Sequence, residues 1–166
     1  MGPISVTKTI DAPRERVFAL VADLAKRPAF TDHFLTDFHL QRIESTGVGA
    51  AARFQADAPR FSIWMESVIA ELEPPYRLIE RGHGSRADRM AVGTAWELVE
   101  DSSGTTGITV SFWTEPENTL DKFKGMLGAE RWYAKQWRQA LERLAALAES
   151  GVEVESLRIA GGERLY

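Results

Sequence analysis

The residue best placed to do chemistry is a carboxylate inside an apolar helical pattern. Apolar residues recur at helical spacing over residues 119–148, and Glu130 falls in the middle of that stripe, near Ala134 and Trp137. Burial of an unpaired carboxylate is costly and favours its protonated form. Such a group could hydrogen-bond a ligand or act as a general acid or base. Glu130 is therefore the candidate catalytic residue.

Two structural interpretations of Glu130 stay open beside this one. The apolar stripe could open to solvent at this position, which would leave the carboxylate hydrated. Alternatively, the carboxylate could pair with an arginine such as Arg53 or Arg81. Either arrangement would remove the reason to expect catalysis from Glu130.

Other residue types that often carry chemistry give weaker signals. The chain has no cysteine, and His33, His39 and His83 lack the spacing of a helical zinc motif. No Gly-x-Ser-x-Gly motif supports a serine nucleophile, and the Gly47-Val48-Gly49 run lacks the lysine and hydroxyl residue of a phosphate loop. We therefore expect no metal and no cofactor.

Composition limits the class of partner. The 166 residues carry a formal net charge of −4 without a basic run, which argues against nucleic acid as a partner. No apolar run approaches the ~20 residues of a membrane span, and the N-terminus lacks the pattern of a signal peptide. We expect a cytoplasmic protein, monomeric or homodimeric, with a small hydrophobic molecule as its partner.

The elements that would position a site are mostly strands. Alternating apolar residues and turn signals predict strands over residues 4–10, 34–44, 50–57, 61–72, 76–83, 90–98 and 108–112. Short turns between most of them favour an antiparallel meander. Two short helices are expected between the first and second strands, the first of them beginning at Pro13. One long helix follows the last strand.

Geometry then predicts a pocket. Seven strands about 4.8 Å apart make a sheet roughly 30 Å wide, whereas a helix is about 10–12 Å across. The sheet must curl around the helix to bury its apolar face, and an incompletely filled interior would hold a ligand. The candidate ligand-binding residues are Phe54, Trp96, Phe112, Phe123, Leu127, Glu130, Ala134 and Trp137.

Several motifs resemble the START-like helix-grip superfamily, also called SRPBCC or polyketide cyclase/dehydrase-like. They are Ile10-Asp11-Ala12-Pro13 with the following Val17-Phe18 and Val21-Ala22-Asp23, the Gly47-Val48-Gly49 turn, the segment from Glu71 to Leu78, and the long last helix. The resemblance covers residues 3–149 and leaves 150–166 as a C-terminal tail, which could dock or stay loose.

This resemblance implies an α+β helix-grip fold. It consists of a seven-stranded curved antiparallel sheet wrapped around a long C-terminal helix, with two short helices between strands one and two. It also implies an apolar cavity between sheet and helix. Members of the superfamily include lipid and sterol carriers, polyketide aromatases and cyclases, and chaperone activators.

The sequence favours a protein that binds a small hydrophobic ligand, lipid-like or aromatic and polyketide-like, in that cavity. The first alternative is an aromatase, cyclase or dehydratase-type enzyme, which needs converging polar groups where the pattern places only Glu130. The second is a chaperone-activator-like interaction protein, which needs an exposed recognition patch. Trp132, on the polar side of the helical wheel, is the one candidate for that patch.

Overall fold

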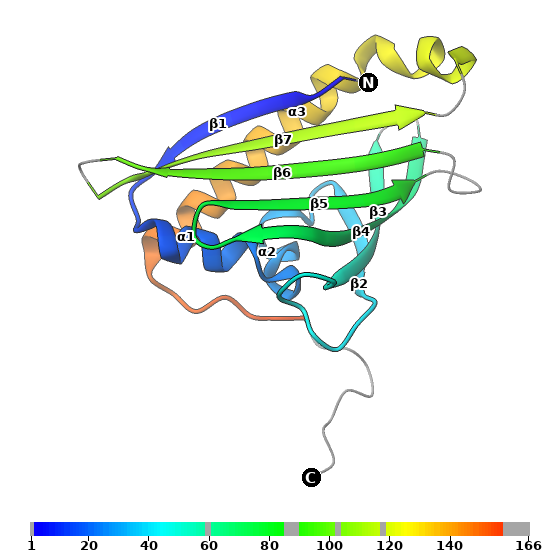
Figure 1. Cartoon of the computed structure of the whole chain (residues 1–166). Helices are drawn as coiled ribbons and strands as arrows, with labels where there is room; N and C mark the ends of the chain where they lie inside the picture. The colour runs from blue at the N-terminus through cyan, green and yellow to red at the C-terminus, as the bar shows by residue number, and fades with distance from the viewer. Residues whose placement is uncertain (1, 59–60, 85–89, 102–103, 117–118, 158–166) are drawn as a thin grey trace.

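The computed structural model describes residues 2–58, 61–84, 90–101, 104–116 and 119–157, and gives the backbone alone for residues 61, 116 and 119–127. Seven strands and one long helix dominate it (Figure 1). In chain order the elements are β1 (Ile4–Ile10), α1 (Arg14–Val21), the 3-10 turn η1 (Leu24–Lys26), α2 (Pro28–Thr31), β2 (Leu35–Leu40), β3 (Ala51–Ala58), β4 (Phe61–Glu73), β5 (Arg77–Gly84), β6 (Met90–Glu100), β7 (Thr106–Pro116) and α3 (Thr119–Ser150).

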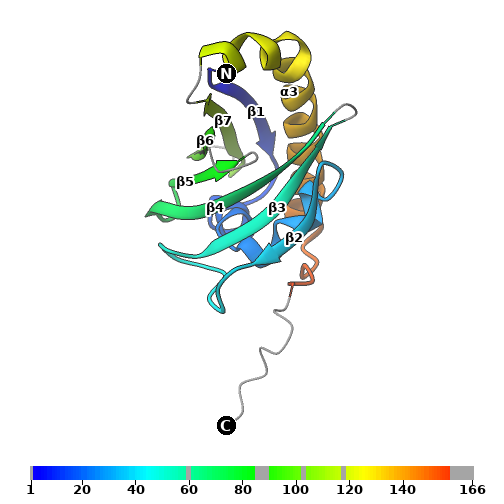
Figure 2. The ribbon, with the colours of Figure 1, turned by 90° about the vertical axis from the view of Figure 1, so that its right-hand side faces the viewer.

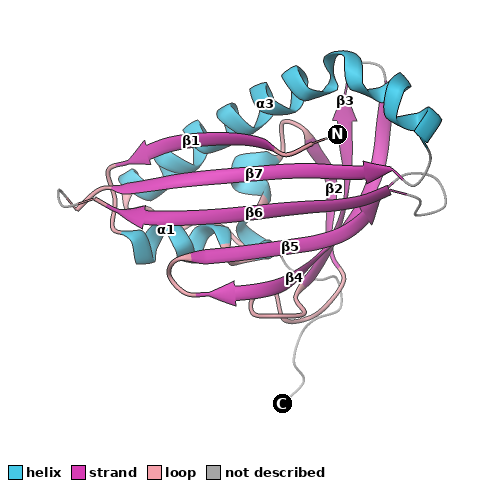
Figure 3. Cartoon of the chain, turned by 45° about the horizontal axis from the view of Figure 1, so that its top comes forward, coloured by secondary structure: helices cyan, strands magenta, loops and turns pink. Residues whose placement is uncertain are grey.

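The strands form one antiparallel sheet in the order β1-β7-β6-β5-β4-β3-β2. The sheet curls strongly from β4 to β2, and α3 lies on its concave side (Figure 2). Figure 3 shows α3 running along the sheet beside β1, and it also packs against α1 and α2. This arrangement confirms the predicted α+β helix-grip fold with a long C-terminal helix.

The connection between β1 and β2 differs slightly from the expectation of two short helices. The 3-10 turn η1 stands between α1 and α2, because the Asp23 carboxylate accepts a hydrogen bond from the Ala25 amide (3.0 Å) and caps a new turn. Strand β2 is also shorter than the predicted 34–44. Its pairing with β3 shifts register near Asp37, whose φ of 48° interrupts a regular strand.

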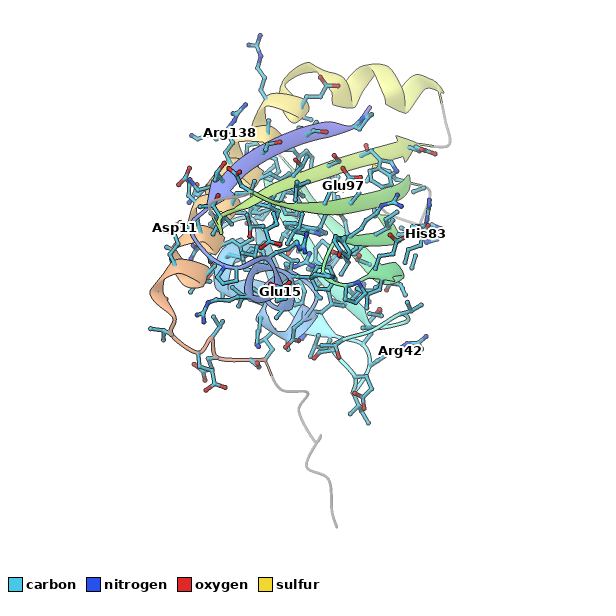
Figure 4. The ribbon with its side chains drawn as sticks, turned by 60° about the vertical axis from the view of Figure 1, so that its left-hand side comes forward. Asp11, Glu15, Arg42, His83, Glu97 and Arg138 are labelled. Atoms are coloured by element: carbon cyan, nitrogen blue, oxygen red, sulfur yellow. The ribbon has the colours of Figure 1, made fainter. Side chains whose placement is uncertain are left out.

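Burial alternates along the strands as a one-sided sheet requires. In β4 the side chains of Met65, Ser67 and Ile69 are buried on the concave face, whereas Trp64 is exposed on the convex face. Arg53 of β3 lies over the Trp64 ring, 4.8 Å from its centroid. Charged side chains such as Arg42 and Arg138 lie on the outside of the molecule (Figure 4).

The long helix bends at a glycine. Gly128 has a φ of +101°, in the left-handed region that side chains other than glycine rarely adopt. Figure 2 shows the change of direction between the first part of α3 and the remainder. Beyond the bend α3 buries Tyr133, Trp137, Leu141 and Leu144 against the core.

The described part of the tail docks on the body. The Leu157 amide donates to the Ala25 carbonyl (2.9 Å), and Val154 packs against the core as a half-buried side chain. Arg16 fixes the start of the tail through a hydrogen bond to the Ala148 carbonyl (2.6 Å). Beside α2, the tail borders an open surface groove of about 1110 Å³.

A buried ion pair crosses from the helical connection to the sheet. Arg27, just before α2, donates to Glu80 of β5 at 2.8 Å, and both side chains are only 3% exposed. The Trp96 indole donates to the same carboxylate oxygen (3.0 Å), and the Ser67 hydroxyl donates to the other one (2.8 Å). Arg27 also donates to the Val21 carbonyl at the end of α1 (2.9 Å). Both carboxylate oxygens of Glu80 are therefore hydrogen-bonded.

Removing the Glu80 carboxylate should strongly destabilise the fold. The Glu80→Ala substitution would leave the Arg27 guanidinium buried without a counter-charge, and we expect a loss of about 3–5 kcal/mol in the free energy of unfolding. Urea unfolding followed by circular dichroism measures the loss. The matched control is Glu97→Ala, which removes an exposed carboxylate 4.0 Å from Arg77 and should cost less than about 1 kcal/mol. Equal losses in the two variants would contradict a special role for the buried pair.

Candidate functional site

Aromatic side chains fill the space between the concave face and α3. Trp137 of α3 lies edge-on to Trp96 of β6 (ring centroids 5.5 Å apart) and to Phe34 (5.1 Å). Phe112 of β7 contacts Tyr133, with 4.7 Å between centroids. All five side chains are buried. Rings in such mutual contact form an apolar, mostly aromatic interior.

At one end of the sheet, apolar side chains on the concave face are partly exposed to solvent. Register places Phe54, Met65, Gly84 and Met90 in one row on the concave face of β3 to β6. Phe54 and Met90 are half-buried, and Phe54 stacks face to face on Phe38 with 5.4 Å between centroids. This row lies four residues along β5 from Glu80, or about 13 Å. This end of the concave face therefore carries partly exposed apolar side chains.

Among the described residues, the acid–base groups Tyr133 and Glu80 in the interior are either neutral or hydrogen-bonded. Burial raises the pKa of Tyr133, so its phenol stays protonated at neutral pH. Both oxygens of Glu80 accept hydrogen bonds within the core. This set of groups suits holding a ligand better than moving a proton.

His33 bridges the helical connection and α3. Its Nε2–H donates to the Gln136 carbonyl (3.2 Å), and its Nδ1 accepts from Arg143 (2.9 Å), which fixes a neutral tautomer. Burial is the main cause that lowers the pKa of His33 below 6.5, and the Arg143 guanidinium acts in the same direction. The Gln136 hydrogen bond and the Asp32 carboxylate oppose this shift. His33 therefore serves the packing of α3 as a neutral group.

Several predicted ligand-binding residues lie on the surfaces that face each other. Trp96, Phe112 and Trp137 are buried at the interface of sheet and helix, and Phe54 and Ala134 are half-buried. The structure thus brings Trp96 and Phe112 into contact with Trp137. The side chains of Phe123 and Leu127 lie outside the described part of the chain, so their predicted role stays an expectation.

Glu130 does not occupy the buried position that the helical wheel gave it. Its side chain is exposed. A wheel shows which side of a helix a residue faces but not how far along the helix that side is covered. The arginines considered as partners lie elsewhere: Arg53 over Trp64, and Arg81 beside Glu71 (3.4 Å). Glu130 is thus placed where the apolar stripe opens to solvent, and the basis for a catalytic role is lost.

One other expectation from the helical wheel needs revision. Trp132, assigned to the polar side of α3, is half-buried and contacts Phe34 with 6.1 Å between ring centroids. It is therefore a poor recognition patch for a chaperone. His83 is exposed and pairs in register with Glu66 on the convex face. No group of three or more potential metal ligands gathers anywhere in the described ranges.

Sequence reasoning missed the polar cluster around Arg27 and Glu80. A signal for Glu80 existed, since it shares the buried side of β5 with Leu78, where a carboxylate is unexpected. Arg27 lies in a segment without periodicity, so nothing in its surroundings indicates burial. Their pairing joins positions 53 residues apart and depends on the tertiary fold.

Comparison with known protein families identifies the family of this chain. Residues 1–149 match the family described as polyketide cyclase / dehydrase and lipid transport. The chain belongs to this family. No functionally curated protein matches its sequence. Among its described residues, none of the helices is both long and apolar enough to cross a bilayer.

Solved structures share the fold of this family member at low identity. A START superfamily protein from Mycobacterium smegmatis is 11% identical, with a TM-score of 0.69 over 92% of this chain and 100% of the other. Ginseng major latex-like protein 151 from Panax ginseng is 11% identical, with a TM-score of 0.70 over 89% and 97%. A protein from Chromobacterium violaceum is 22% identical, with a TM-score of 0.64 over 89% and 97%. These similarities establish the fold alone.

The lowered pKa of His33 predicts a pH-dependent contribution to stability. Between that pKa and 6.5 the unfolded chain binds more protons, so the contribution is lost as pH falls through this window and is present above it. His33→Gln keeps an uncharged side chain that can donate and accept hydrogen bonds. Urea unfolding between about pH 5 and about pH 7.5 should therefore show a steeper gain in stability for the wild type than for the variant. Parallel pH profiles would contradict this assignment.

Proposed function

We propose that the protein binds a small, largely apolar molecule between the concave face of the sheet and α3. The observation that carries this proposal is that Phe54 and Met90 are half-buried on the same concave face as the buried aromatic interior. Apolar surface left partly in water is unfavourable, and a hydrophobic ligand would cover it. The family, described by polyketide cyclisation, dehydration and lipid transport, is consistent with such a ligand.

Ligand binding is better supported than cyclase or dehydratase chemistry. A catalytic acid or base needs a group free to exchange a proton with the substrate. Glu80 is saturated with hydrogen bonds, His33 is held between Arg143 and Gln136, and Glu130 is exposed. A similar fold occurs in a putative protein of the dynemicin biosynthetic locus, which is 20% identical with a TM-score of 0.61. This chain covers 48% of that protein, so the likeness extends to the fold only.

A neutral fluorescent probe tests the proposal. N-phenyl-1-naphthylamine should show a saturable rise in fluorescence with the wild-type protein, because its rings would leave water for the aromatic interior. Phe54→Ala removes a half-buried ring of the approach and should weaken binding about two- to tenfold, the usual value of an aromatic contact. Fluorescence titration at constant temperature gives both dissociation constants.

The matched control for this titration is Trp64→Ala. Trp64 is an aromatic residue of the neighbouring strand that lies on the convex face. Its removal should leave probe affinity unchanged. The absence of saturable binding to the wild type, or an equal loss in both variants, would contradict a site between the sheet and α3.

A further inference from the structure

The indole nitrogen of Trp137 is a buried hydrogen-bond donor without a partner. Among the described residues, four buried side-chain nitrogens make no hydrogen bond: the Nε atoms of Arg14, Arg27 and Arg77, and Nε1 of Trp137. Each arginine has a carboxylate within 4.0 Å of its guanidinium, so its charge is compensated. Trp137 is different, because the unpaired nitrogen is the one polar atom of its side chain. A buried donor without a partner costs about 1–3 kcal/mol.

Two residues with hydroxyl groups, Tyr133 and Thr94, neighbour Phe112, whose ring also contacts Trp137. Tyr133 precedes Trp137 by one helical turn, and both rings contact Phe112, at 4.7 and 6.0 Å between centroids. Thr94 of β6 is the register partner of Phe112 on the concave face. Tyr133 is 4% exposed and Thr94 is 9% exposed. None of the side-chain hydrogen bonds found among the described residues involves either hydroxyl.

The charge around this group favours an uncharged ligand. Among the described residues, Arg27 is the cation of the buried core, and the Glu80 carboxylate already compensates its charge. Trp137, Tyr133 and Thr94 can donate hydrogen bonds but carry no charge. An ionised carboxylate or phosphate placed among them would be desolvated without a counter-charge, which is costly.

We propose that the bound molecule carries a neutral carbonyl-type oxygen that accepts a hydrogen bond from Trp137 Nε1. The hydroxyls of Tyr133 and Thr94 provide further polar contacts around that oxygen, and the aromatic rings hold the apolar remainder. The ligand class is thus an uncharged ketone, ester or quinone with an apolar body. This inference rests on the proposed function and adds the polar requirement that selects among apolar molecules.

A matched pair of probes tests the hydrogen bond. 2-Acetonaphthone carries a ketone oxygen, and 2-ethylnaphthalene has a similar shape without an acceptor. Trp137→Phe keeps an aromatic ring and removes the donor. The preference of the wild type for the ketone, expressed as the ratio of the two dissociation constants, should fall about two- to tenfold in the variant, the range of a neutral hydrogen bond. Taking the ratio cancels the effect of the smaller ring on both probes.

Indole NMR on the wild-type protein gives a second readout that does not depend on a variant folding. With ¹⁵N-labelled tryptophan, the Nε1–H signal of Trp137 should move further with 2-acetonaphthone than with 2-ethylnaphthalene. The signal of Trp96, whose indole already donates to Glu80 at 3.0 Å, is the internal reference and should respond equally to both probes.

The two proposals fail in different ways. If both probes bind but the ratio is the same in the wild type and Trp137→Phe, and the Trp137 signal does not distinguish them, the hydrogen bond is wrong and the apolar site stands. If neither probe binds the wild type, the proposed function is wrong. The hydrogen bond from Trp137 to a ligand oxygen is then wrong as well.

Discussion

The ion pair between Arg27 and Glu80 determines how the helical connection meets the sheet. Through Glu80 it joins Arg27 to Trp96 of β6 and Ser67 of β4, and Arg27 also holds the carbonyl end of α1. Desolvation of two charges is expensive, so the pair can be favourable only because its geometry satisfies both carboxylate oxygens. The result is a fixed polar cluster within an interior that is otherwise built from aromatic contacts.

This cluster divides the interior into two parts with different properties. At Glu80 both carboxylate oxygens accept hydrogen bonds, and Trp96 is fully buried. Further along the same strands, Phe54 and Met90 are half-buried. Trp137 packs against both Trp96 and Phe112. The cluster around Glu80 and the candidate ligand site are therefore in contact through the Trp96 and Trp137 rings. Close packing of these rings keeps the binding groups in place before a ligand arrives.

The fold was largely predictable because its signals are local. Alternation in β1 and β3 to β7, the turn residues and the long apolar stripe of α3 each depend on neighbours in sequence. The site was predictable only in part. Trp96 and Phe112 follow from the same alternation and Trp137 from the helical stripe. Glu130 was misplaced because a wheel gives the side of a helix but not how far along the helix that side is covered. The Arg27–Glu80 contact joins distant segments, and such a contact has no local pattern.

The unpaired indole of Trp137 also has a consequence for the stability of the free protein. A phenylalanine would fill much of the same space among Trp96, Phe34 and Phe112 and would bring no unsatisfied donor into the core. The smaller ring would also leave part of that space empty, which itself costs stability. In the free protein the unpaired Nε1 costs about 1–3 kcal/mol, and a bound acceptor would restore that stability. Such a compromise between stability and activity is common where a binding site is built into a hydrophobic core.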